Sequence, residues 1–286
     1  MSPRPLGILA GRGIYPKLLF DAITRTGVPV VVVGMAGQTD VVFFHNADIF
    51  KLLPIGAIAG AARFFRTHNV DSIFFAGGIQ RHGVWRHLRP DRRGAGLIAD
   101  ALLSGDDTLL RHTADAFGEY GVTVSDPASY IRDMLAPRGH LAGPPPTDSI
   151  LADLDAATTA AFALGTADRG QAAIAKEGRV VAVEGRAGTD HLIRSASARG
   201  GVIAKVVKPG QDRRFDLPAI GPDTVCRCHA HGMVAIGVEA GGVLLLEKEK
   251  LMAASDAAGV CLVGIAGSGD SGITHECSYP DPLPPQ

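Results

Sequence analysis

The run Leu6-Gly-Ile-Leu-Ala-Gly-Arg-Gly13 carries the signal that decides the fold of the first half of the chain. Its apolar part, Leu6–Ala10, predicts a buried strand, and the Gly-Arg-Gly that follows predicts a tight turn. The next stretch, Tyr15–Thr26, predicts a helix that is closed by a glycine. Because N–H groups at a helix N-terminus attract anions, we expect Gly11 and Gly13 to contact a phosphate or sugar of a ligand. The alternative is a plain strand-to-helix turn without a ligand.

The same alternation of short apolar runs and helical stretches continues through the first half of the chain. The predicted strands are Pro29–Val33, Ser72–Phe75 and Val122–Val124, and the predicted helices are Ala57–His68, Leu97–Leu103 and Thr108–Tyr120. Buried strands that are separated by helices are typical of a parallel sheet with crossover helices. We therefore predict an α/β fold that begins with a Rossmann-like parallel-sheet domain.

A second pair of glycines follows another predicted strand. Gly77 and Gly78 come directly after Ser72–Phe75 and Ala76. Ligands of parallel α/β sheets bind beyond the carboxyl ends of the strands. Because both glycine pairs fall at such ends, we expect Gly77 and Gly78 to contact the substrate as well.

A break in this pattern falls at Leu135–Pro146, which contains four prolines and two glycines. Proline runs favour extended linkers, so we place a linker at residues 137–148, between a domain at residues 1–136 and a domain at residues 149–270. A tail at residues 271–286 is expected to be flexible. In the second domain the predicted strands are Arg179–Glu184, Gly201–Val207, Val243–Glu247 and Val260–Ile265, and the predicted helices run from a cap at Asp148 or Ser149 to about Leu164 and over Glu249–Ala258. This mixture predicts a smaller mixed α/β domain.

The overall composition excludes several classes of protein. The 286 residues carry a formal net charge of −1, so no basic field predicts binding to nucleic acid. The sequence contains neither a secretory signal nor a run of about 18 apolar residues that would predict a membrane span. All four cysteines follow residue 200, which is typical of a reducing compartment rather than of a disulfide framework. We therefore expect a cytoplasmic protein.

Two short polar clusters each have a ligand-binding and a structural interpretation. Asp106 and Asp107 beside Gly105 could hold a divalent cation, but on spacing alone a helix cap is the stronger interpretation. Thr189 and Asp190 are equally suited to cap a short helix. An arginine one turn into that helix could pair with a diphosphate through its planar fork, or could lie solvated.

The densest charged cluster lies at Lys205–Gly221. Lys205 ends an apolar strand, and Lys208 and two arginines follow within ten residues, with Asp216 after them. A phosphoryl-transfer site needs cations for the phosphate oxygens and a carboxylate for a metal ion, and this segment supplies both. The alternative is a solvated charged loop, although the Leu-Pro-x-Ile-Gly sequence at its end argues against a floppy one.

A cysteine- and histidine-rich stretch follows this cluster. Cys226, Cys228, His229 and His231 could ligate zinc by residue type, but structural zinc sites usually need two separated ligand pairs. No second pair with suitable spacing exists in the sequence. We therefore interpret these residues as ordinary thiols and imidazoles at a helix.

Several segments, taken in order, resemble a known family. They are Gly7–Gly13 with Pro16, Phe75–Gly78, Gly105–Arg111, Pro137–Gly139, Glu184 with Gly188–Asp190, and above all Lys205–Gly221. The chain resembles, from about residue 6 to residue 265, the UDP-2,3-diacylglucosamine diphosphatases of lipid A synthesis that have two domains and no calcineurin-like fold. The resemblance implies a cytoplasmic enzyme that hydrolyses UDP-2,3-diacylglucosamine to UMP and 2,3-diacylglucosamine 1-phosphate, depends on Mg²⁺ and holds its substrate between two domains.

The resemblance also implies roles for particular residues. The essential aspartate of the family falls on Asp216, which would bind magnesium or orient the attacking water, and Lys205 and Lys208 would offset charge on the phosphate oxygens. The other expected substrate contacts are Gly11, Gly13, Gly77, Gly78, Gly105, Asp106, Asp107, Thr189, Asp190, Arg194 and Gln211. Because the product is a lipid, we expect peripheral contact with the inner face of the inner membrane. The sequence leaves the oligomeric state open, a homodimer included.

Two other functions compete with this interpretation. A nicotinamide-dependent oxidoreductase would need a third glycine where Pro16 stands, and an acid after the second strand, where Gly34 and Met35 stand. A non-catalytic protein that binds a nucleotide sugar or a lipid would bind the same ligand without releasing UMP.

Overall fold

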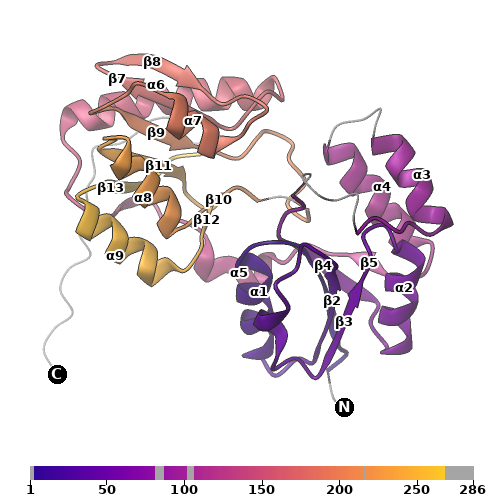
Figure 1. The fold of residues 1–286 in the computed structure, drawn as a ribbon. Helices are drawn as coiled ribbons and strands as arrows, with labels where there is room; N and C mark the ends of the chain where they lie inside the picture. Colours follow the sequence, from indigo (N-terminus) through magenta and orange to yellow (C-terminus); the bar gives the residue numbers. More distant parts are fainter. Residues whose placement is uncertain (1–2, 81–86, 102–105, 216, 268–286) are drawn as a thin grey trace, which may run out of the picture. The chain divides into compact units, whose positions relative to one another are not determined.

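The computed structural model describes residues 3–80, 87–101, 106–215 and 217–267, with the backbone alone at residues 97–101, 106 and 107. It divides into two compact units (Figure 1). The first comprises Met1–Asp133 together with Gln211–Asp216, and the second comprises Met134–Gly210 and Leu217–Gln286. A short segment of the Lys205–Gly221 cluster is therefore part of the first unit, although about 80 residues separate it in sequence from the rest of that unit.

The first unit is built on a five-stranded sheet with the order β3-β2-β1-β4-β5, in which all neighbours are parallel. Its strands are β1 (Leu6–Ala10), β2 (Val30–Met35), β3 (Ile49–Leu53), β4 (Ser72–Ala76) and β5 (Thr123–Val124). Its helices are α1 (Tyr15–Thr24), α2 (Ile58–Thr67), α3 (Arg92–Ala101), α4 (Asp106–Gly118) and α5 (Ala128–Ile131), with 3₁₀ turns η1 (Val41–Phe44) and η3 (Arg132–Met134). This is the order of the first five strands of doubly wound α/β sheets, so the predicted α/β class is confirmed.

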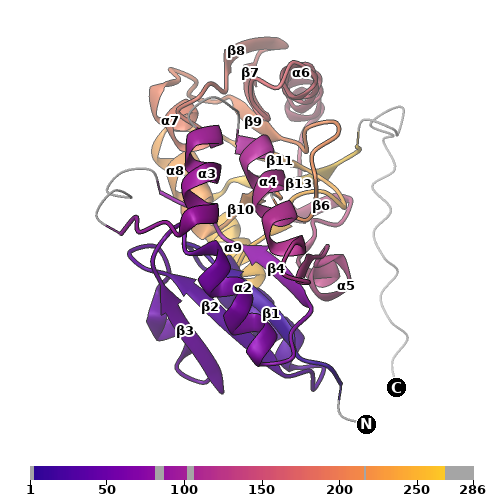
Figure 2. The same ribbon diagram turned by 90° about the vertical axis from the view of Figure 1, so that its right-hand side faces the viewer.

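Helices cover both faces of this sheet because alternate strand residues point to opposite sides. On one face, Val31 and Val33 pack with Phe65 of α2 and Phe117 of α4, and the rings of Phe65 and Phe117 lie 6.4 Å apart. In Figure 2, α2, α3 and α4 face the viewer on this side of the sheet. On the other face, Phe74 of β4 meets a tyrosine of α5 edge to face.

The second unit contains a six-stranded mixed sheet with the order β6-β13-β11-β9-β7-β8. Its central strands β9, β11 and β13 are parallel, and β6, β7 and β8 run antiparallel to their neighbours. The strands are β6 (Gly139–Ala142), β7 (Ala172–Lys176), β8 (Arg179–Val183), β9 (Val202–Lys205), β11 (Ala235–Glu239) and β13 (Cys261–Ile265). A separate parallel pair joins β10 (Ala219–Ile220) to β12 (Leu244–Leu245). The prediction of a mixed α/β second half is thus confirmed.

Alternating side chains divide the core of the second unit into two halves. One half packs against α6 (Asp148–Thr166), through Leu154 and the strand residues Ala173, Val202 and Ala235. The other half includes strand residues such as Ile203 and packs against α7 (Thr189–Ser195), α8 (Pro222–Ala230) and α9 (Lys248–Ala258). Each half removes a continuous apolar surface from water, which is the main stabilising term of such a unit.

Several predicted elements differ from those observed. Five strands, β3, β6, β7, β10 and β11, escaped prediction. The strand signal is weak in β7 because Ala172-Ala-Ile-Ala-Lys176 is rich in alanine, and in β11 because Gly237 interrupts it. The predicted strand Val243–Glu247 shortens to the two residues of β12. Strand β6 lies inside the expected linker at residues 137–148. The described residues contain no helix that is long and apolar enough to cross a bilayer.

Helix starts also differ from the predicted caps. The N-cap of α6 is Thr147, whose hydroxyl accepts the N–H of Ile150 at 3.4 Å, rather than Asp148 or Ser149. Helix α4 begins at Asp106, two residues before the predicted start at Thr108. Helix boundaries depend on long-range packing as well as on local capping, so shifts of a few residues are ordinary.

Candidate active site

Two glycine turns lie side by side at the carboxyl ends of β1 and β4. The N–H of Gly11 donates to the carbonyl of Ala76 at 2.7 Å, and the N–H of Arg12 donates to the carbonyl of Gly78 at 2.8 Å. Gly78 returns a hydrogen bond to Arg12 at 3.3 Å, which forms an isolated antiparallel bridge between the turns. From β1, the sheet grows on one side through β2 and β3 and on the other side through β4 and β5. The crevice between β1 and β4, where the strand order reverses, is where such sheets bind ligands.

The four glycines of these turns have different physical requirements. A Cβ on Gly11 would lie 2.6 Å from the carbonyl oxygen of Gly78, and a Cβ on Gly77 would overlap the carbonyl oxygen of Arg12. Gly77 also has a φ of +81°, a conformation that other residues rarely adopt. By contrast, a Cβ on Gly13 or Gly78 would meet nothing within 4 Å. Close packing of the turns therefore requires Gly11 and Gly77, whereas the backbone at Gly13 and Gly78 is open to a ligand.

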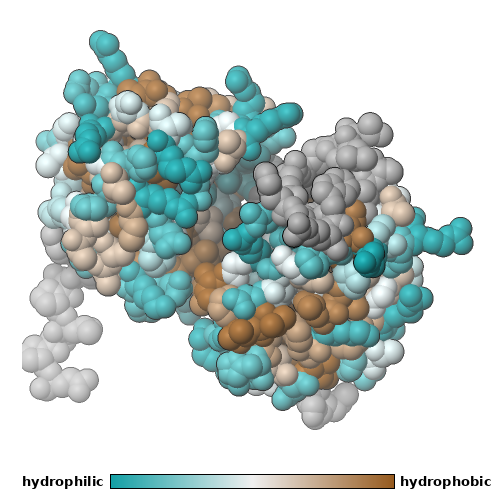
Figure 3. Space-filling model, viewed as in Figure 1, coloured by the Kyte–Doolittle hydropathy of each residue, from teal (hydrophilic) through white to brown (hydrophobic). Residues whose placement is uncertain are grey.

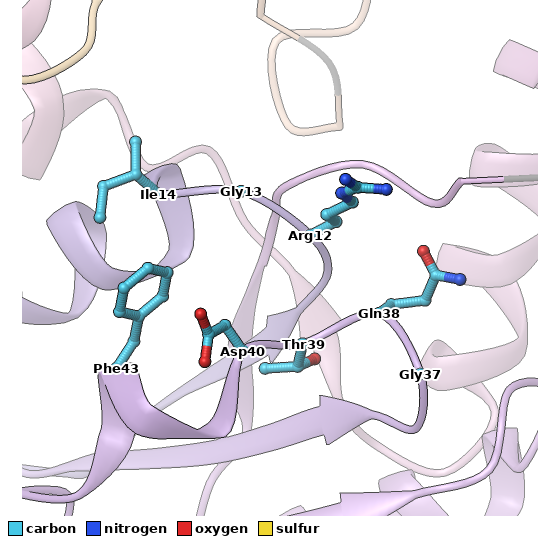
Figure 4. A pocket seen from close by; sticks show the side chains of 8 residues that line it. All are labelled: Arg12, Gly13, Ile14, Gly37, Gln38, Thr39, Asp40 and Phe43. Carbon is cyan, nitrogen blue, oxygen red and sulfur yellow. The ribbon is translucent and has the colours of Figure 1, made fainter.

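A pocket of about 550 Å³ opens beside the first of these turns (Figure 4). It is lined by Arg12, Gly13 and Ile14 from the loop after β1, and by Gly37, Gln38, Thr39, Asp40 and Phe43 from the segment after β2. Sequence analysis identified only Gly13 among these residues. The signal that was missed is Asp40, an acid five residues beyond the end of β2 rather than immediately after it.

Two hydrogen-bonded side chains hold the walls of this pocket together. The hydroxyl of Thr39 donates to the carbonyl of Ala10 at 2.5 Å and accepts the N–H of Met35 at 2.7 Å. Gln38 is buried and pairs with the backbone of Gln80, accepting its N–H at 2.8 Å and donating to its carbonyl at 3.3 Å. These contacts connect the ends of β1 and β2 with the segment after β4. The pocket is therefore built on the carboxyl ends of these parallel strands.

The segment 211–215 is anchored at the same edge of the first unit. The ring of Phe215 packs on Phe75 of β4, with centroids 5.8 Å apart, and the guanidinium of Arg214 lies 4.7 Å from the centre of the Phe215 ring. Arg214 donates from Nε and Nη2 to the two carboxylate oxygens of Asp212, at 2.9 and 2.6 Å. Asp216 itself lies outside the described residues, but it is the next residue in the chain after this anchor.

The ion pair between Asp212 and Arg214 shifts the pKa of both residues. The hydrogen bond from Arg214 lowers the pKa of Asp212, and the charge of Arg111 on α4 acts in the same direction. The hydrogen bond to Asp212 raises the pKa of Arg214, with smaller contributions from Asp115 and Asp126. Both groups are therefore charged at neutral pH, and the pair holds the segment in one conformation.

We expect Asp212→Asn to destabilise the protein modestly and only above acidic pH. A lowered pKa in the folded state stabilises the fold above the ordinary aspartate pKa of about 4, and this stabilisation is lost as pH falls through the lowered value. Because the pair is partly exposed, the effect should stay within about 1 kcal/mol at pH 7. Urea unfolding of both proteins from pH 7 to pH 3 measures it. If the difference in free energy of unfolding between the wild type and Asp212→Asn grew as pH fell, the lowered pKa of Asp212 would be contradicted.

The other predicted residues of the Lys205–Gly221 cluster lie in or next to the second unit. Lys205 ends β9, and its ammonium donates to the carbonyl of Ala219 at 3.0 Å. Lys208 is ion-paired with Asp168 at 2.9 Å, and its side chain is 26% exposed. Gln211 begins the segment that belongs to the first unit. The segment from Lys205 to Gln211 thus runs from one unit of the protein to the other.

The predicted cap of the short helix α7 is wrong. Its N-cap is Gly188, and no side chain caps it. Thr189 instead donates its hydroxyl to the buried carboxylate of Glu184 at 2.6 Å, and Asp190 forms an ion pair with Arg227. These two side chains therefore have structural partners.

Three other predicted contacts have no described side-chain geometry, and a fourth is an exposed arginine. Asp106 and Asp107 occupy the first turn of α4, where the structure describes the backbone alone. Gly105 lies outside the described residues. Arg194 lies in the last turn of α7 and is exposed.

Two of the three described cysteines, Cys228 and Cys261, belong to the packing of the second unit. Cys228 lies on α8 and is fully buried in the core of the second unit. Burial raises the pKa of its thiol to about 12, and the charge of Asp190 adds a smaller increase. Cys226, two residues away, is exposed. Within the described ranges no three Asp, Glu, His or Cys side chains converge as metal ligands would.

The fold and this edge of the sheet define the class of protein. It is a two-unit α/β protein whose candidate ligand site lies at the carboxyl ends of parallel strands, where open glycine turns and a charged segment are found.

Comparison with known proteins narrows this class. The family model of the LpxI N-terminal domain matches residues 5–134, and that of the LpxI C-terminal domain matches residues 137–263. A curated relative from Caulobacter vibrioides, named UDP-2,3-diacylglucosamine pyrophosphatase LpxI, is 32% identical over 278 residues, which cover 92% of this chain and 98% of the relative. The chain belongs to the LpxI family.

Proposed function

We propose that the protein hydrolyses the diphosphate of UDP-2,3-diacylglucosamine to UMP and 2,3-diacylglucosamine 1-phosphate, a step of lipid A biosynthesis. The observation that carries this proposal is the match of both LpxI domains along nearly the whole chain, together with a relative of that activity that is aligned almost end to end. The open turn at Gly13, which leads into the N-terminus of α1, suits a phosphate of the diphosphate, because N–H groups at a helix N-terminus bind phosphate oxygens.

In the proposed reaction a water molecule attacks a phosphorus atom of the diphosphate. A new phosphorus–oxygen bond forms, the bridging bond breaks, the leaving phosphate takes the electron pair, and the proton of water passes to solvent. Negative charge grows on the phosphate oxygens during this step, so nearby cations lower its barrier. Lys205 and Lys208 are the cations that we assign to this role, and Asp216 is the carboxylate that orients the water or holds the metal.

We propose that Asp216 and the diphosphate of the substrate together hold a magnesium ion. Magnesium is usually bound by one or two carboxylates together with phosphate oxygens and water. A site of this kind needs a single protein carboxylate, which Asp216 would supply, so it does not need the cluster of ligands that is absent from the described residues. When bound, the ion neutralises charge on the diphosphate oxygens.

The anchored segment that precedes Asp216 in the chain supports the role that we propose for this residue. Phe215 packs on Phe75, and Arg214 is held by Asp212 and by the Phe215 ring. A carboxylate that must act on a phosphorus within fractions of an ångström benefits from a rigid neighbour, because misplacement by about 1 Å costs on the order of 100-fold in rate. Asp212, Arg214 and Phe215 are therefore positioning residues for Asp216.

We also propose that the protein works in the cytoplasm in peripheral contact with the inner membrane. The substrate and one product carry two acyl chains, which partition into the bilayer. The first unit exposes Val41 and Val42 beside the pocket, at 46% and 69% exposure, and Ile79 after the second glycine turn, at 46%. Figure 3 shows apolar surface on this unit among hydrophilic residues. Exposed apolar side chains of this kind would favour contact with lipid.

We expect the purified protein to release UMP from UDP-2,3-diacylglucosamine only when magnesium is present. Chelation with EDTA should reduce the rate at least about 100-fold, because the charge on the diphosphate is then uncompensated, and excess magnesium should restore it. Chromatographic measurement of UMP over time checks this. Equal rates in EDTA would contradict the magnesium requirement, and substrate binding without UMP in either condition would identify a non-catalytic binding protein instead.

A further inference from the structure

Two hydrogen bonds fix the chain where it leaves strand β9, directly after Lys205. The N–H of Val206 donates to the carbonyl of Gln171 at 2.9 Å. The N–H of Val207 donates to Oε2 of Glu239 at 2.7 Å. The side chain of Val206 is also fully buried in the core of the second unit. The backbone that follows Lys205 is therefore held by contacts from two other segments of this unit.

Glu239 supplies one of these contacts through its side chain rather than through the sheet ladder. Strands β9 and β11 lie side by side (Figure 1), and their parallel register ends with the pair Lys205 and Val238. Glu239 is the last residue of β11, and a Cβ on Gly267 would lie 3.0 Å from its Oε1. The carboxylate thus lies between the ends of β9 and β13. Because hydrogen bonds to a carboxylate are about twice as strong as those to a neutral acceptor, this contact holds the chain after β9 firmly.

The other contact depends on a second carboxylate, that of Glu184. Glu184 is buried, and its two oxygens accept the hydroxyl of Thr189 at 2.6 Å and the N–H of Gln171 at 2.7 Å. The carbonyl of the same Gln171 accepts the N–H of Val206. A buried carboxylate is stable only where its oxygens are hydrogen-bonded, so these contacts give Glu184 one position. Gln171 transmits that position to the chain after β9.

Helix α6 holds the far end of this short segment. Lys208 forms an ion pair with Asp168, which follows the helix. A Cβ on Gly165 would lie 3.3 Å from Cα of Lys208 and 3.1 Å from Cδ of Pro209, so the segment packs closely on α6. The backbone between Lys205 and Lys208 is therefore fixed at both ends.

We propose that Glu239, with Glu184 acting through Gln171, is a positioning residue for Lys205 and Lys208. This inference rests on the proposed function, in which the two lysines offset charge on the diphosphate. A lysine side chain is long and flexible, so the place of its ammonium depends on how firmly its backbone is held. Both carboxylates act on the backbone beside the lysines, so this role requires no contact with the substrate.

Variants of Glu239 in the full chain test this role through kcat and KM for release of UMP from UDP-2,3-diacylglucosamine with magnesium. Glu239→Ala removes the acceptor and should lower kcat about 30-fold with KM changed less than about threefold, because displacing a catalytic group by about 1 Å costs up to about 100-fold in rate. Glu239→Gln keeps an oxygen that accepts the N–H of Val207, so its kcat should stay within about fivefold of the wild type. Equal losses in both variants would indicate a metal ligand or a base and would overturn the positioning role.

Asp153→Ala is the matched control, because Asp153 is a carboxylate of the same unit with a purely local task. This buried side chain of α6 accepts the N–H groups of Glu177 and Gly178 at 3.2 and 2.6 Å. These residues form the turn between β7 and β8, at the opposite end of the sheet from Lys205. The control should lower the free energy of unfolding in urea and leave kcat of the folded protein unchanged. A loss of kcat equal to that of Glu239→Ala would reduce the effect to general destabilisation and overturn the proposal.

A double-variant cycle identifies the groups through which Glu239 acts. In a Lys205→Met background, Glu239→Ala should lower kcat by less than about a further fivefold, because one of the cations that it positions is already absent. The same further loss as in the wild-type background would overturn the positioning role. A wild type that releases no UMP would refute the proposed function and this role with it, whereas normal turnover of Glu239→Ala beside an active wild type refutes the positioning role alone.

Discussion

Asp216→Ala is expected to reduce the release of UMP from UDP-2,3-diacylglucosamine to background, a loss of at least about 1,000-fold in kcat, while substrate binding survives. The loss is large because a carboxylate that holds the metal or orients water acts on the charge of the transition state, and groups of this kind are worth about 100- to 1,000-fold or more each. Binding survives because the open glycine turns and the pocket beyond β1 and β2 are made by other residues. Single-turnover kinetics with UMP detection, together with calorimetry of UMP binding, separate the two effects.

The control for this variant is Asp155→Ala. Asp155 is an exposed aspartate on α6 that does not line the described pocket, so its replacement removes the same chemical group from a position outside the candidate site. It should leave both turnover and binding unchanged. Near-normal turnover in Asp216→Ala would refute the catalytic assignment, and an equal loss of binding would show that Asp216 holds the substrate in its ground state instead.

Gly77→Ala should destabilise the protein by about 2–5 kcal/mol. An alanine at a φ of +81° pays about 1–2 kcal/mol for the left-handed conformation, and its methyl group overlaps the carbonyl oxygen of Arg12 in the neighbouring turn, which adds about 1–3 kcal/mol of overpacking. Since Arg12 lines the pocket, a displaced turn should also weaken UMP binding. Denaturant unfolding followed by circular dichroism, with calorimetry for UMP, measures both effects.

The neighbouring residue provides a matched comparison. A Cβ on Gly78 would meet nothing within 4 Å, and Gly78 has no positive φ, so Gly78→Ala should change stability by less than about 1 kcal/mol. Equal stabilities of the two variants would mean that the close contact between the turns does not stabilise the unit.

Much of the fold follows from local patterns that the chain repeats. The buried run Leu6–Ala10 and the helix from Tyr15 appear where apolar periodicity and the glycine turn predict them. Strands β7 and β11 were missed because alanine and glycine carry no strand signal of their own, and only burial between helices makes them strands. The caps at Thr147 and Gly188 show the same limit, since neighbouring residues of similar capping ability compete and packing decides among them.

Some residues of the candidate site could be predicted from the sequence, and others could be found only in the structure. Gly13 and Gly78 were identified from position alone, because a turn at the carboxyl end of a parallel strand is open to ligands in any such sheet. Asp40 and Phe43 were not identified, because they follow β2 by a loop whose path no local pattern specifies. The expectation that Thr189 or Asp190 caps α7 is wrong, because Glu184 and Arg227 provide stronger partners from other elements.

The sequence by itself determined the α/β class, the positions of the two glycine turns and the family, because these depend on residue patterns within about 20 positions and on the order of motifs along the chain. Only the tertiary structure decided which glycines serve packing, where the pocket lies, and that Phe215 of the Lys205–Gly221 segment packs on Phe75, 140 residues earlier in the chain. The physical reason is that a contact between distant residues depends on how every intervening element packs, and so leaves no mark in the local sequence around either residue.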